Sequence, residues 1–298
     1  MPTTDSIVFI SGASNGMGRL TARTLAENGY TVVAAMRDAN GKNAAAADEL
    51  RKVKAKTPVR VVELDVTHDA SVSSGVQAAL DAYGRIDVLV NCAGVMWTGI
   101  TEAFTAQQLQ DILNTNLVGT FRVFKAVLPA MRKQQRGLCI TITSLAGRTM
   151  APGMGIYAAS KAGTEALAEI IGYEIASQNI DSVIIEPGFF QTNLLAGQRE
   201  PEDKSVAEAY GPHFSPFQRV HENVTKAIME AGVQNTDPQI IANLVRSLIE
   251  TPAGRRPLRV TAGLDFCATA LNEAAAPHQQ QFLRLLGFRD ELRVRAGE

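Results

Sequence analysis

Short, continuously apolar runs alternate with segments of helical periodicity between residues 7 and 188. The runs are rich in β-branched residues, and they lack the apolar–polar alternation of a strand that faces water on one side. Continuous runs of this kind are typical of parallel strands that are buried on both faces. The regular exchange of strand and helix patterns therefore predicts an α/β fold, a doubly wound parallel sheet of about seven strands with helices on both faces.

The expected strands cover residues 7–10, 30–35, 59–64, 86–90, 138–142, 181–185 and 258–261. The expected helices cover residues 17–28, 42–56, 69–83, 105–135, 157–178 and 237–250. Their ends rest on local signals: Asn28-Gly29 stops the first helix, and Asp237-Pro238 places an N-cap and a first-turn proline at the start of the last.

The regular pattern breaks after Pro187-Gly188. A long irregular insertion in a compact domain is usually functional, so we expect a substrate lid at about 189–236. The C-terminal tail, about 272–298, has helical stretches but a weak pattern. No second core emerges, and we predict that residues 1–298 form a single domain.

Composition and charge narrow the class of protein. The 298 residues are 46% hydrophobic and 20% charged, which is a globular composition, and the formal net charge is −1. A near-neutral chain lacks the basic surplus of a nucleic-acid or membrane-surface binder. We expect neither a signal peptide nor a membrane span. The three cysteines and four histidines are scattered, which predicts no metal site and a reducing, cytoplasmic setting.

The first predicted strand runs into a glycine-rich turn, Ser11-Gly-Ala-Ser-Asn-Gly-Met-Gly18, with the spacing GxxxGxG. Glycines allow a tight turn, and they let the backbone approach a pyrophosphate at the N-terminus of the following helix. A merely tight strand–helix turn would also favour glycine. The strand before and the helix after favour a Rossmann-type dinucleotide site formed by Gly12, Ser14, Asn15, Gly16, Met17 and Gly18.

The end of the second strand predicts which dinucleotide binds. An acidic residue there holds the ribose 2′-hydroxyl of NAD, whereas an arginine accepts the 2′-phosphate of NADP. Here Met36 stands at the usual acidic position and Arg37 follows. The guanidinium matches phosphate geometry, which favours NADP(H), with NAD as the less favoured cofactor. Two alternatives stay open: Arg37 is only a solvated loop residue, or Asp38 binds the ribose.

Tyr157 and Lys161 are four residues apart and share one face of a predicted helix. A phenol has a pKa near 10 in water, and a neighbouring cation lowers it. A Tyr–Lys pair of this kind can serve acid–base chemistry, although a surface contact would leave the same pattern.

Several motifs together resemble the short-chain dehydrogenase/reductase family, in its compact single-domain branch. They are the glycine turn, Asn91-Cys-Ala-Gly94, Asn114-Thr-Asn116, Ser144 thirteen residues before Tyr157, Tyr157 with Lys161, and Pro187-Gly188. The resemblance is strong from about residue 7 to residue 192 and loose elsewhere. The chain departs from the family in Ser11, where threonine is usual, and in Cys92, but no essential group is lost.

The resemblance implies a role for each matching position. Tyr157 would be the general acid/base, Lys161 would hold the nicotinamide ribose and favour the phenolate, Ser144 would bind the substrate oxygen, and Asn116 would position a water. Asn91, Ala93 and Gly94 would line the adenosine ribose, and Asp65 would take the adenine amino group with Val66 beside it. Pro187, Gly188 and Thr192 would contact the carboxamide and the phosphates.

These implications favour an NADP(H)-dependent oxidoreductase that moves hydride between nicotinamide and a carbonyl or secondary alcohol. The alternative is an NADP-binding regulatory protein of the same fold without significant turnover. The substrate is expected to be an apolar small molecule, since Met96, Trp97, Phe189, Phe190 and the lid residues Tyr210, Phe214 and Phe217 could line its pocket. Family resemblance also implies a homodimer or a homotetramer.

Overall fold

The computed structural model describes residues 5–190, 198–211, 216–232, 236–288, 290–292 and 294. A seven-stranded parallel sheet runs through the molecule in the order β3-β2-β1-β4-β5-β6-β7, which confirms the predicted doubly wound α/β fold. The strands are β1 (Ile7–Ser11), β2 (Thr31–Met36), β3 (Arg60–Glu63), β4 (Val88–Asn91), β5 (Gly137–Ile142), β6 (Ile180–Pro187) and β7 (Arg259–Ala262).

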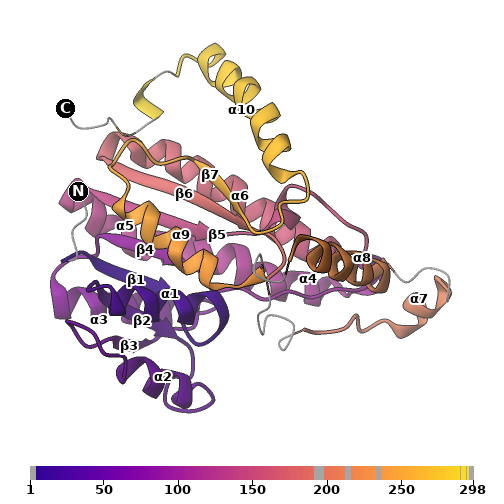
Figure 1. Cartoon of the computed structure of the whole chain (residues 1–298), viewed down its shortest axis with the longest axis horizontal. Coiled ribbons are helices and arrows are strands. Elements are labelled where there is room, and N and C mark those ends of the chain that lie inside the picture. The colour runs from indigo at the N-terminus through magenta and orange to yellow at the C-terminus, as the bar shows by residue number, and fades with distance from the viewer. Residues whose placement is uncertain are drawn as a thin grey trace.

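Helices cover both faces of this sheet (Figure 1). One face packs against α1 (Gly16–Glu27), α2 (Ala44–Arg51) and α9 (Gln239–Glu250). The other face packs against α3 (Asp69–Tyr83), α5 (Gly119–Gln134) and α6 (Gly155–Ile175). Successive side chains of β1 alternate between the two cores: Val8 and Ile10 lie in the first, and Ile7 and Phe9 in the second. Burial on both faces explains why the strands read as continuous apolar runs.

The chain order reverses between β1 and β4, which are neighbours in the sheet. From β1 the chain builds outward through β2 to β3, and it then returns to β4 and builds the other half. In open α/β sheets the crevice at such a switch point, beyond the carboxyl ends of the strands, is where ligands bind. The glycine turn after β1 and the Asn91 segment at the end of β4 therefore share that crevice.

The single helix expected over residues 105–135 is in fact three segments. They are α4 (Ala106–Leu113), the π-helical turn η2 (Asn114–Val118) and α5. A capping box of Thr105 and Gln108 opens α4. In the wide turn, the Thr120 hydroxyl donates to the Asn116 carbonyl at 2.8 Å. Single π turns of this kind are frequent at functional sites.

Two helices begin later than the sequence predicts. The α2 helix is shorter than 42–56 because the Asp38 carboxylate accepts a hydrogen bond from the Lys42 backbone at 2.8 Å, which holds a turn ahead of the helix. In α9, Pro238 stands at the N-cap rather than in the first turn. Asp237 still caps the helix, since its carboxylate accepts from the backbone N–H of Gln239 at 2.8 Å.

The segment predicted as a lid holds two helices, α7 (Lys204–Ala209) and α8 (Pro216–Ala231), and α7 packs against the short turn η1 (Thr101–Ala103). The tail region forms a long helix, α10 (Ala268–Leu285), which stands away from the sheet in Figure 1, followed by η7 (Asp290–Leu292). Its pattern is weak because Leu271, Phe282 and Leu285 are exposed rather than turned to a core. Among the described helices, none is long and apolar enough to cross a bilayer.

Candidate active site

The glycine turn after β1 has the close backbone contacts that a phosphate site needs. Gly12 has φ of +73°, and a Cβ there would lie 2.6 Å from the Ala93 Cα. A Cβ on Gly18 would lie 2.3 Å from the Gly12 carbonyl oxygen. Side chains are therefore excluded at both positions. Asn15 forms no side-chain capping bond to α1, so the first-turn N–H groups are left for an anion between Ser14 and Met17.

The Asn91 segment lies directly across from this turn. The Ser11 hydroxyl accepts a hydrogen bond from the Cys92 backbone at 3.2 Å, so serine keeps the link between β1 and β4. The Asn91 side chain is 3% exposed, and its amide nitrogen has no partner among the described residues. A buried donor without a partner is costly unless a ligand supplies the acceptor. The residues Gly12, Asn91, Ala93 and Gly94 therefore fit the adenosine half of a dinucleotide.

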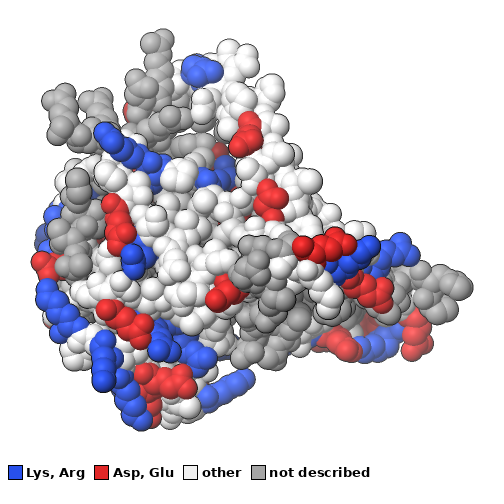
Figure 2. Space-filling model, in the orientation of Figure 1, with Lys and Arg blue, Asp and Glu red and all other residues white. Residues whose placement is uncertain are grey.

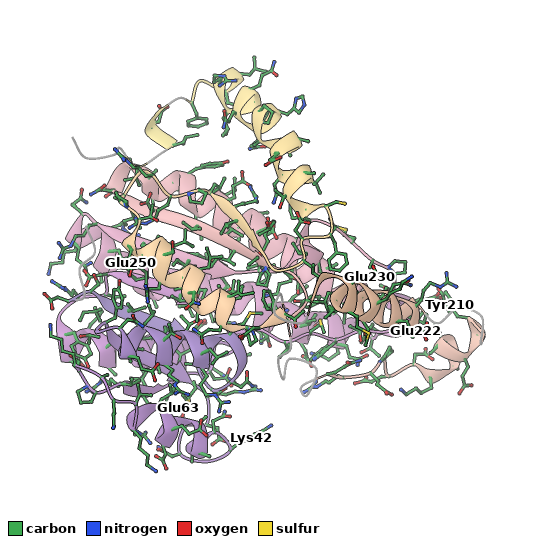
Figure 3. The ribbon with its side chains drawn as sticks, in the orientation of Figure 1. Lys42, Glu63, Tyr210, Glu222, Glu230 and Glu250 are labelled. Carbon is green, nitrogen blue, oxygen red and sulfur yellow. The ribbon has the colours of Figure 1, made fainter. Side chains whose placement is uncertain are left out.

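In the loop after β2, Arg37 is exposed, whereas the residues next to it are buried or hydrogen-bonded. Met36 is 1% exposed and belongs to the core, so it offers nothing to a ribose. Glu63 accepts hydrogen bonds from the backbone N–H groups of Asp38 and Ala39, at 2.6 and 2.8 Å, beside the loop (Figure 3). The Asp38 carboxylate is engaged with Lys42 in its own turn. The Arg37 guanidinium makes no ion pair within the described parts of the chain.

Asp65 follows β3 near Arg37. Its carboxylate accepts two hydrogen bonds from Thr67, at 2.9 Å from the backbone and 2.7 Å from the hydroxyl. Burial raises the pKa of Asp65, but these bonds and the nearby Arg37 lower it overall, so the carboxylate is ionised at neutral pH. Val66 is buried and touches the position where a Gly119 side chain would stand. Both residues lie at the edge where the adenine is predicted.

Tyr157 and Lys161 lie one turn apart on α6, as the spacing predicts. The side chains are almost fully buried, with the Lys161 Nζ 5.9 Å from the centre of the Tyr157 ring. Lys161 donates to the carbonyl oxygen of Ile142 at 3.2 Å, at the end of β5. The pair is therefore a buried constellation and not a surface contact.

The pKa of Tyr157 differs from the sequence-based expectation. Burial raises it to about 12, while hydrogen bonding by Ser144 acts in the opposite direction. Burial also lowers the pKa of Lys161 to about 8, against the attraction of Cys92 and Glu165. In the protein without a bound cofactor, desolvation of Tyr157 therefore outweighs the lowering of its pKa that was expected from the Lys161 ammonium. Tyr157 is a protonated phenol at neutral pH.

Asn116 is brought inward by the π turn and joins three elements. Its amide donates to the Val95 carbonyl and to the Ser160 hydroxyl, both at 2.9 Å, and its carbonyl oxygen accepts from the Val95 backbone at 2.9 Å. A Cβ on Gly94 would lie 3.3 Å from Asn116 and 3.5 Å from the Lys161 ammonium. Asn116 thus lies beside Lys161 at the base of the crevice.

Ser144 stands at the end of β5 as the N-cap of the turn η3 (Leu145–Gly147). Its hydroxyl oxygen accepts from the Ala146 backbone at 3.1 Å, which leaves the hydroxyl hydrogen available to another acceptor. Pro187 closes β6, and the Gly188 backbone donates to Ala262 at 2.8 Å. A side chain at Gly188 would meet the Leu264 carbonyl oxygen at 2.1 Å. Thr192 lies outside the described residues.

An apolar wall surrounds Tyr157. The side chains of Met96, Trp97, Ile112, Ala146, Met154, Ile156 and Tyr157 form one buried cluster. Met96 and Trp97 were predicted there; Met154 and Ala146 were not, because only the fold brings the loop after Ser144 to this place. Among the described residues there is no group of three or more His, Cys, Asp or Glu side chains placed to hold a metal ion.

The predicted lid residues are only partly placed. Phe189 packs edge-to-face on Phe266, with ring centres 6.2 Å apart. Arg199 stacks on Trp97, its guanidinium carbon 5.0 Å from the ring centre. Tyr210 donates to Glu102 at 2.7 Å on the exposed outer part of the molecule, where Figure 3 labels it, rather than beside Tyr157. Phe214 and the side chain of Phe217 lie outside the described residues.

Comparison with known proteins agrees with this geometry. The model of the family described as short chain dehydrogenase matches residues 6–203. A 3-ketodihydrosphingosine reductase of Bacteroides thetaiotaomicron is 34% identical over 208 residues, which are 70% of this chain and 72% of the relative. A putative ketoacyl reductase of the monensin polyketide synthase, from Streptomyces virginiae, is 32% identical over 88% of this chain and 98% of the relative.

A solved structure extends the similarity. A variant of actinorhodin polyketide ketoreductase with NADPH superposes with a TM-score of 0.69 and 28% identity, over 89% of this chain and 99% of that one.

Proposed function

Because the chain belongs to the short-chain dehydrogenase family, we propose that it is an NADP(H)-dependent oxidoreductase in which Tyr157 exchanges a proton with a carbonyl or secondary alcohol substrate. Membership of the family makes the chain an oxidoreductase that acts on keto or alcohol groups. The observation that carries the finer proposal is the buried Tyr157–Lys161 pair, which lies beside Ser144 at the carboxyl ends of the central strands.

The chain's own residues account for the proton chemistry of carbonyl reduction. Tyr157 is protonated at neutral pH and can donate to the oxygen as negative charge develops on it. The Ser144 hydroxyl oxygen accepts from the Ala146 backbone, and its hydrogen can turn from Tyr157 to the same substrate oxygen, which is an oxyanion-type contact. A bound nicotinamide supplies the hydride. Lys161 and Asn116 lie at the base of the crevice. There, Lys161 would bind the nicotinamide ribose and Asn116 would position a water.

The binding residues for the dinucleotide follow the crevice from end to end. The glycine turn (Gly12, Ser14, Asn15, Gly16, Met17 and Gly18) would bind the pyrophosphate, and Asp65, Val66, Asn91, Ala93 and Gly94 would bind the adenosine. Arg37 supports NADP over NAD, because it is exposed without an ion pair in the described structure while Asp38 is already engaged. Solved structures with this fold hold NADPH in one case and NAD in another, so the proposed preference rests on Arg37.

The substrate we propose is a ketone or secondary alcohol on an apolar chain. The cluster around Tyr157 offers apolar walls with Met96, Trp97 and Met154. The two relatives are named for a 3-ketodihydrosphingosine and a ketoacyl substrate, which are both ketones on a longer chain. We expect neither nucleic acid nor a membrane as a partner, and Figure 2 shows Lys and Arg interspersed with Asp and Glu on the visible face, without one large patch of either sign.

The experiment that tests the function follows NADPH absorbance with a panel of ketones of increasing chain length. We expect turnover that improves with apolar chain length, and Tyr157→Phe should retain NADPH binding while kcat falls at least about 100-fold, since the general acid alone is removed. Lys52→Gln, an exposed change at the end of α2, is the control. Turnover that survives in Tyr157→Phe would contradict the mechanism. NADPH binding without turnover of any ketone would favour the regulatory alternative.

A further inference from the structure

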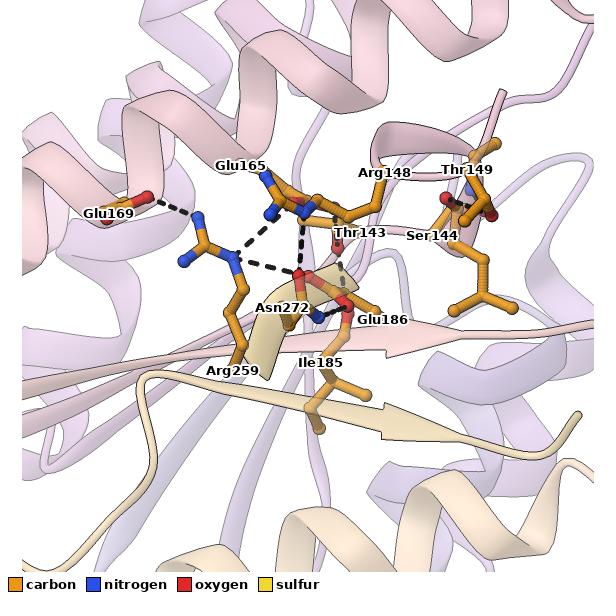
Figure 4. Close-up of polar contacts among 12 residues, drawn as sticks. Thr143, Ser144, Arg148, Thr149, Glu165, Glu169, Ile185, Glu186, Arg259 and Asn272 are labelled. Atoms are coloured by element: carbon orange, nitrogen blue, oxygen red, sulfur yellow. Dashed lines mark hydrogen bonds and ion pairs between the residues drawn. The ribbon is translucent and has the colours of Figure 1, made fainter. Parts of the chain in front are cut away.

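A cluster of buried charges that has no part in the proposed proton transfer lies near Ser144 (Figure 4), and its Glu165 interacts with Lys161. Its acidic members Glu165 and Glu186 are 2% and 0% exposed. The guanidinium of Arg259, from β7, lies between them, with its Nε 3.7 Å from a Glu165 carboxylate oxygen and 3.4 Å from a Glu186 carboxylate oxygen. Arg259 also pairs with Glu169, one turn further along α6.

Asn272 of α10 completes the cluster from outside the sheet. Its amide nitrogen donates to the Glu186 carboxylate at 2.6 Å, and its amide oxygen accepts from the Arg148 guanidinium at 2.8 Å. Arg148 in turn lies 3.9 Å from the Glu165 carboxylate. The helix that stands away from the sheet in Figure 1 is therefore tied at its start to buried groups of the core.

The two buried carboxylates of the cluster are next to segments of the proposed active site. Thr143 precedes Ser144 and donates to Glu165 at 3.1 Å. Glu165 is one turn beyond Lys161 on α6, and Glu186 lies two residues before Gly188. Gly147, in the turn that Ser144 opens, has no room for a side chain, because a Cβ would lie 2.6 Å from the Glu165 carboxylate.

We propose that Glu165, Glu186, Arg259 and Asn272 form a positioning cluster that fixes the segments carrying Ser144, Lys161 and Gly188 relative to one another, so that the docking of α10 through Asn272 sets the geometry of catalysis. These are positioning residues, since they act through their neighbours. The proposal rests on the proposed function for its catalytic consequence, but the rigidity of the segments can be measured without turnover.

Counted without the neighbouring Lys161 ammonium, the charges of the five ionisable side chains in the cluster balance only when the cluster holds one proton. It contains three carboxylates and two guanidiniums and lies next to the buried ammonium of Lys161; the charged members are Glu165, Glu169, Glu186, Arg148 and Arg259. Burial raises the pKa of Glu165 to about 8 and also raises that of Glu186. One proton shared by the two carboxyls makes the cluster neutral at pH 7. Its loss would leave two like charges side by side in the core.

The first test compares Asn272→Ala with Glu273→Ala, an exposed neighbour on the same helix. In Asn272→Ala we expect kcat to fall about tenfold with KM for NADPH unchanged, because a hydrogen bond to a buried charge is lost. Amide hydrogen exchange should rise in residues 143–149 and 185–188 and stay unchanged in Glu273→Ala. Unchanged exchange in these segments would overturn the proposal, whether or not the protein reduces ketones.

The second test uses Glu165→Gln, which imitates the protonated carboxyl and can still accept from Thr143. We expect the protection factors of residues 143–149, which correct exchange for its intrinsic dependence on pH, to fall above about pH 8 in the parent protein and to stay constant in Glu165→Gln. In an active parent, kcat should follow the same pH dependence. An identical pH dependence of exchange in both proteins would overturn the shared-proton part of the proposal. Absence of turnover together with these exchange changes would refute the proposed function and leave the positioning cluster supported.

Discussion

At the scale of single residues, the functional side chains are defined by what burial does to them. Tyr157 and Lys161 are both desolvated, which raises the pKa of the phenol to about 12 and lowers that of the ammonium to about 8, so that the phenol is neutral at pH 7 and the ammonium loses its proton only near pH 8. A neutral phenol is ready to give a proton to a ketone. Arg37, in contrast, is exposed and keeps its charge for a ligand at the rim.

The cofactor preference is tested at this same scale by Arg37→Asp. The change removes the proposed phosphate partner and adds a carboxylate that can bind a ribose hydroxyl, so we expect kcat/KM to shift from NADPH towards NADH by at least about 100-fold, as one charge-assisted contact is replaced by repulsion. Lys42→Asp, on the same loop and pointing into solvent in Figure 3, is the matched control. Equal use of both cofactors by the parent would contradict the assignment to Arg37.

The glycine turn offers a second residue-scale prediction. Gly12 and Gly84 share a positive φ, +73° and +71°, but only Gly12 lacks room, since nothing lies within 4 Å of a Cβ on Gly84. Gly84→Ala should cost about 1–2 kcal/mol of unfolding free energy from backbone strain. Gly12→Ala should cost more and should weaken NADPH binding, because Ala93 must move. Equal losses in urea unfolding would mean that the close contact is unimportant.

At the scale of elements, the sequence predicts whether a segment is a helix or a strand better than it predicts how consecutive segments are joined. The seven strands and the helices around them follow from apolar runs and helical periodicity, which local side-chain chemistry controls. The π turn of residues 114–118 does not, because one extra residue per turn shifts the apolar pattern too little to be seen in a single sequence. The weak pattern of α10 has another cause: exposed Leu271, Phe282 and Leu285 leave no clear core-facing stripe.

The candidate site also has parts that the sequence predicts and parts that it does not. The sequence predicts the glycine turn, Ser144, Tyr157 and Lys161, because these residues belong to motifs whose members are close together in the chain. The cluster of Glu165, Glu186 and Arg259 is not predicted, because its partners are far apart in sequence and meet only when β6 and β7 pair. Glu186 alone could be noticed before Pro187, and its partner could not be named.

The buried carboxyls predict how the packing of α6 against the sheet depends on pH. The pKa of Glu165 is higher in the folded chain, about 8, than its ordinary value of 4.5. Between those values the folded state binds more protons than the unfolded state, so this group's contribution to stability declines as pH rises. We expect Tm to fall from pH 5 to pH 8 in the parent and to fall less in Glu165→Gln. A steeper fall in the variant would contradict the raised pKa.

At the scale of the whole molecule, unpaired apolar side chains point to self-association. Phe121 on α5 and Ile170 on α6 are 45% and 51% exposed, on two of the three helices that cover the second face of the sheet. Isolated exposed apolar residues are ordinary, but large ones on two helices in contact fit an interface between copies. We propose a homodimer or homotetramer that uses these helices.

Sedimentation equilibrium tests this proposal. Phe121→Asp should lower the average mass by at least half, because a carboxylate would be buried in the interface. Phe282→Asp, on the exposed side of α10, is the comparison and should leave the mass unchanged. A loss of association only in Phe282→Asp would move the interface to α10.

The reversal of chain order between β1 and β4 divides the protein's tasks into two modules. Everything proposed to choose the dinucleotide is encoded before Gly94, whereas Ser144, Tyr157 and Lys161 are encoded after it, and the two halves of the sheet are joined at one strand pairing. Cofactor choice can therefore be exchanged by grafting the short segment from β2 to α2, without rebuilding the pocket that receives the substrate. The preference for NADP or NAD and the preference for a substrate can change independently of one another, in evolution or by protein engineering.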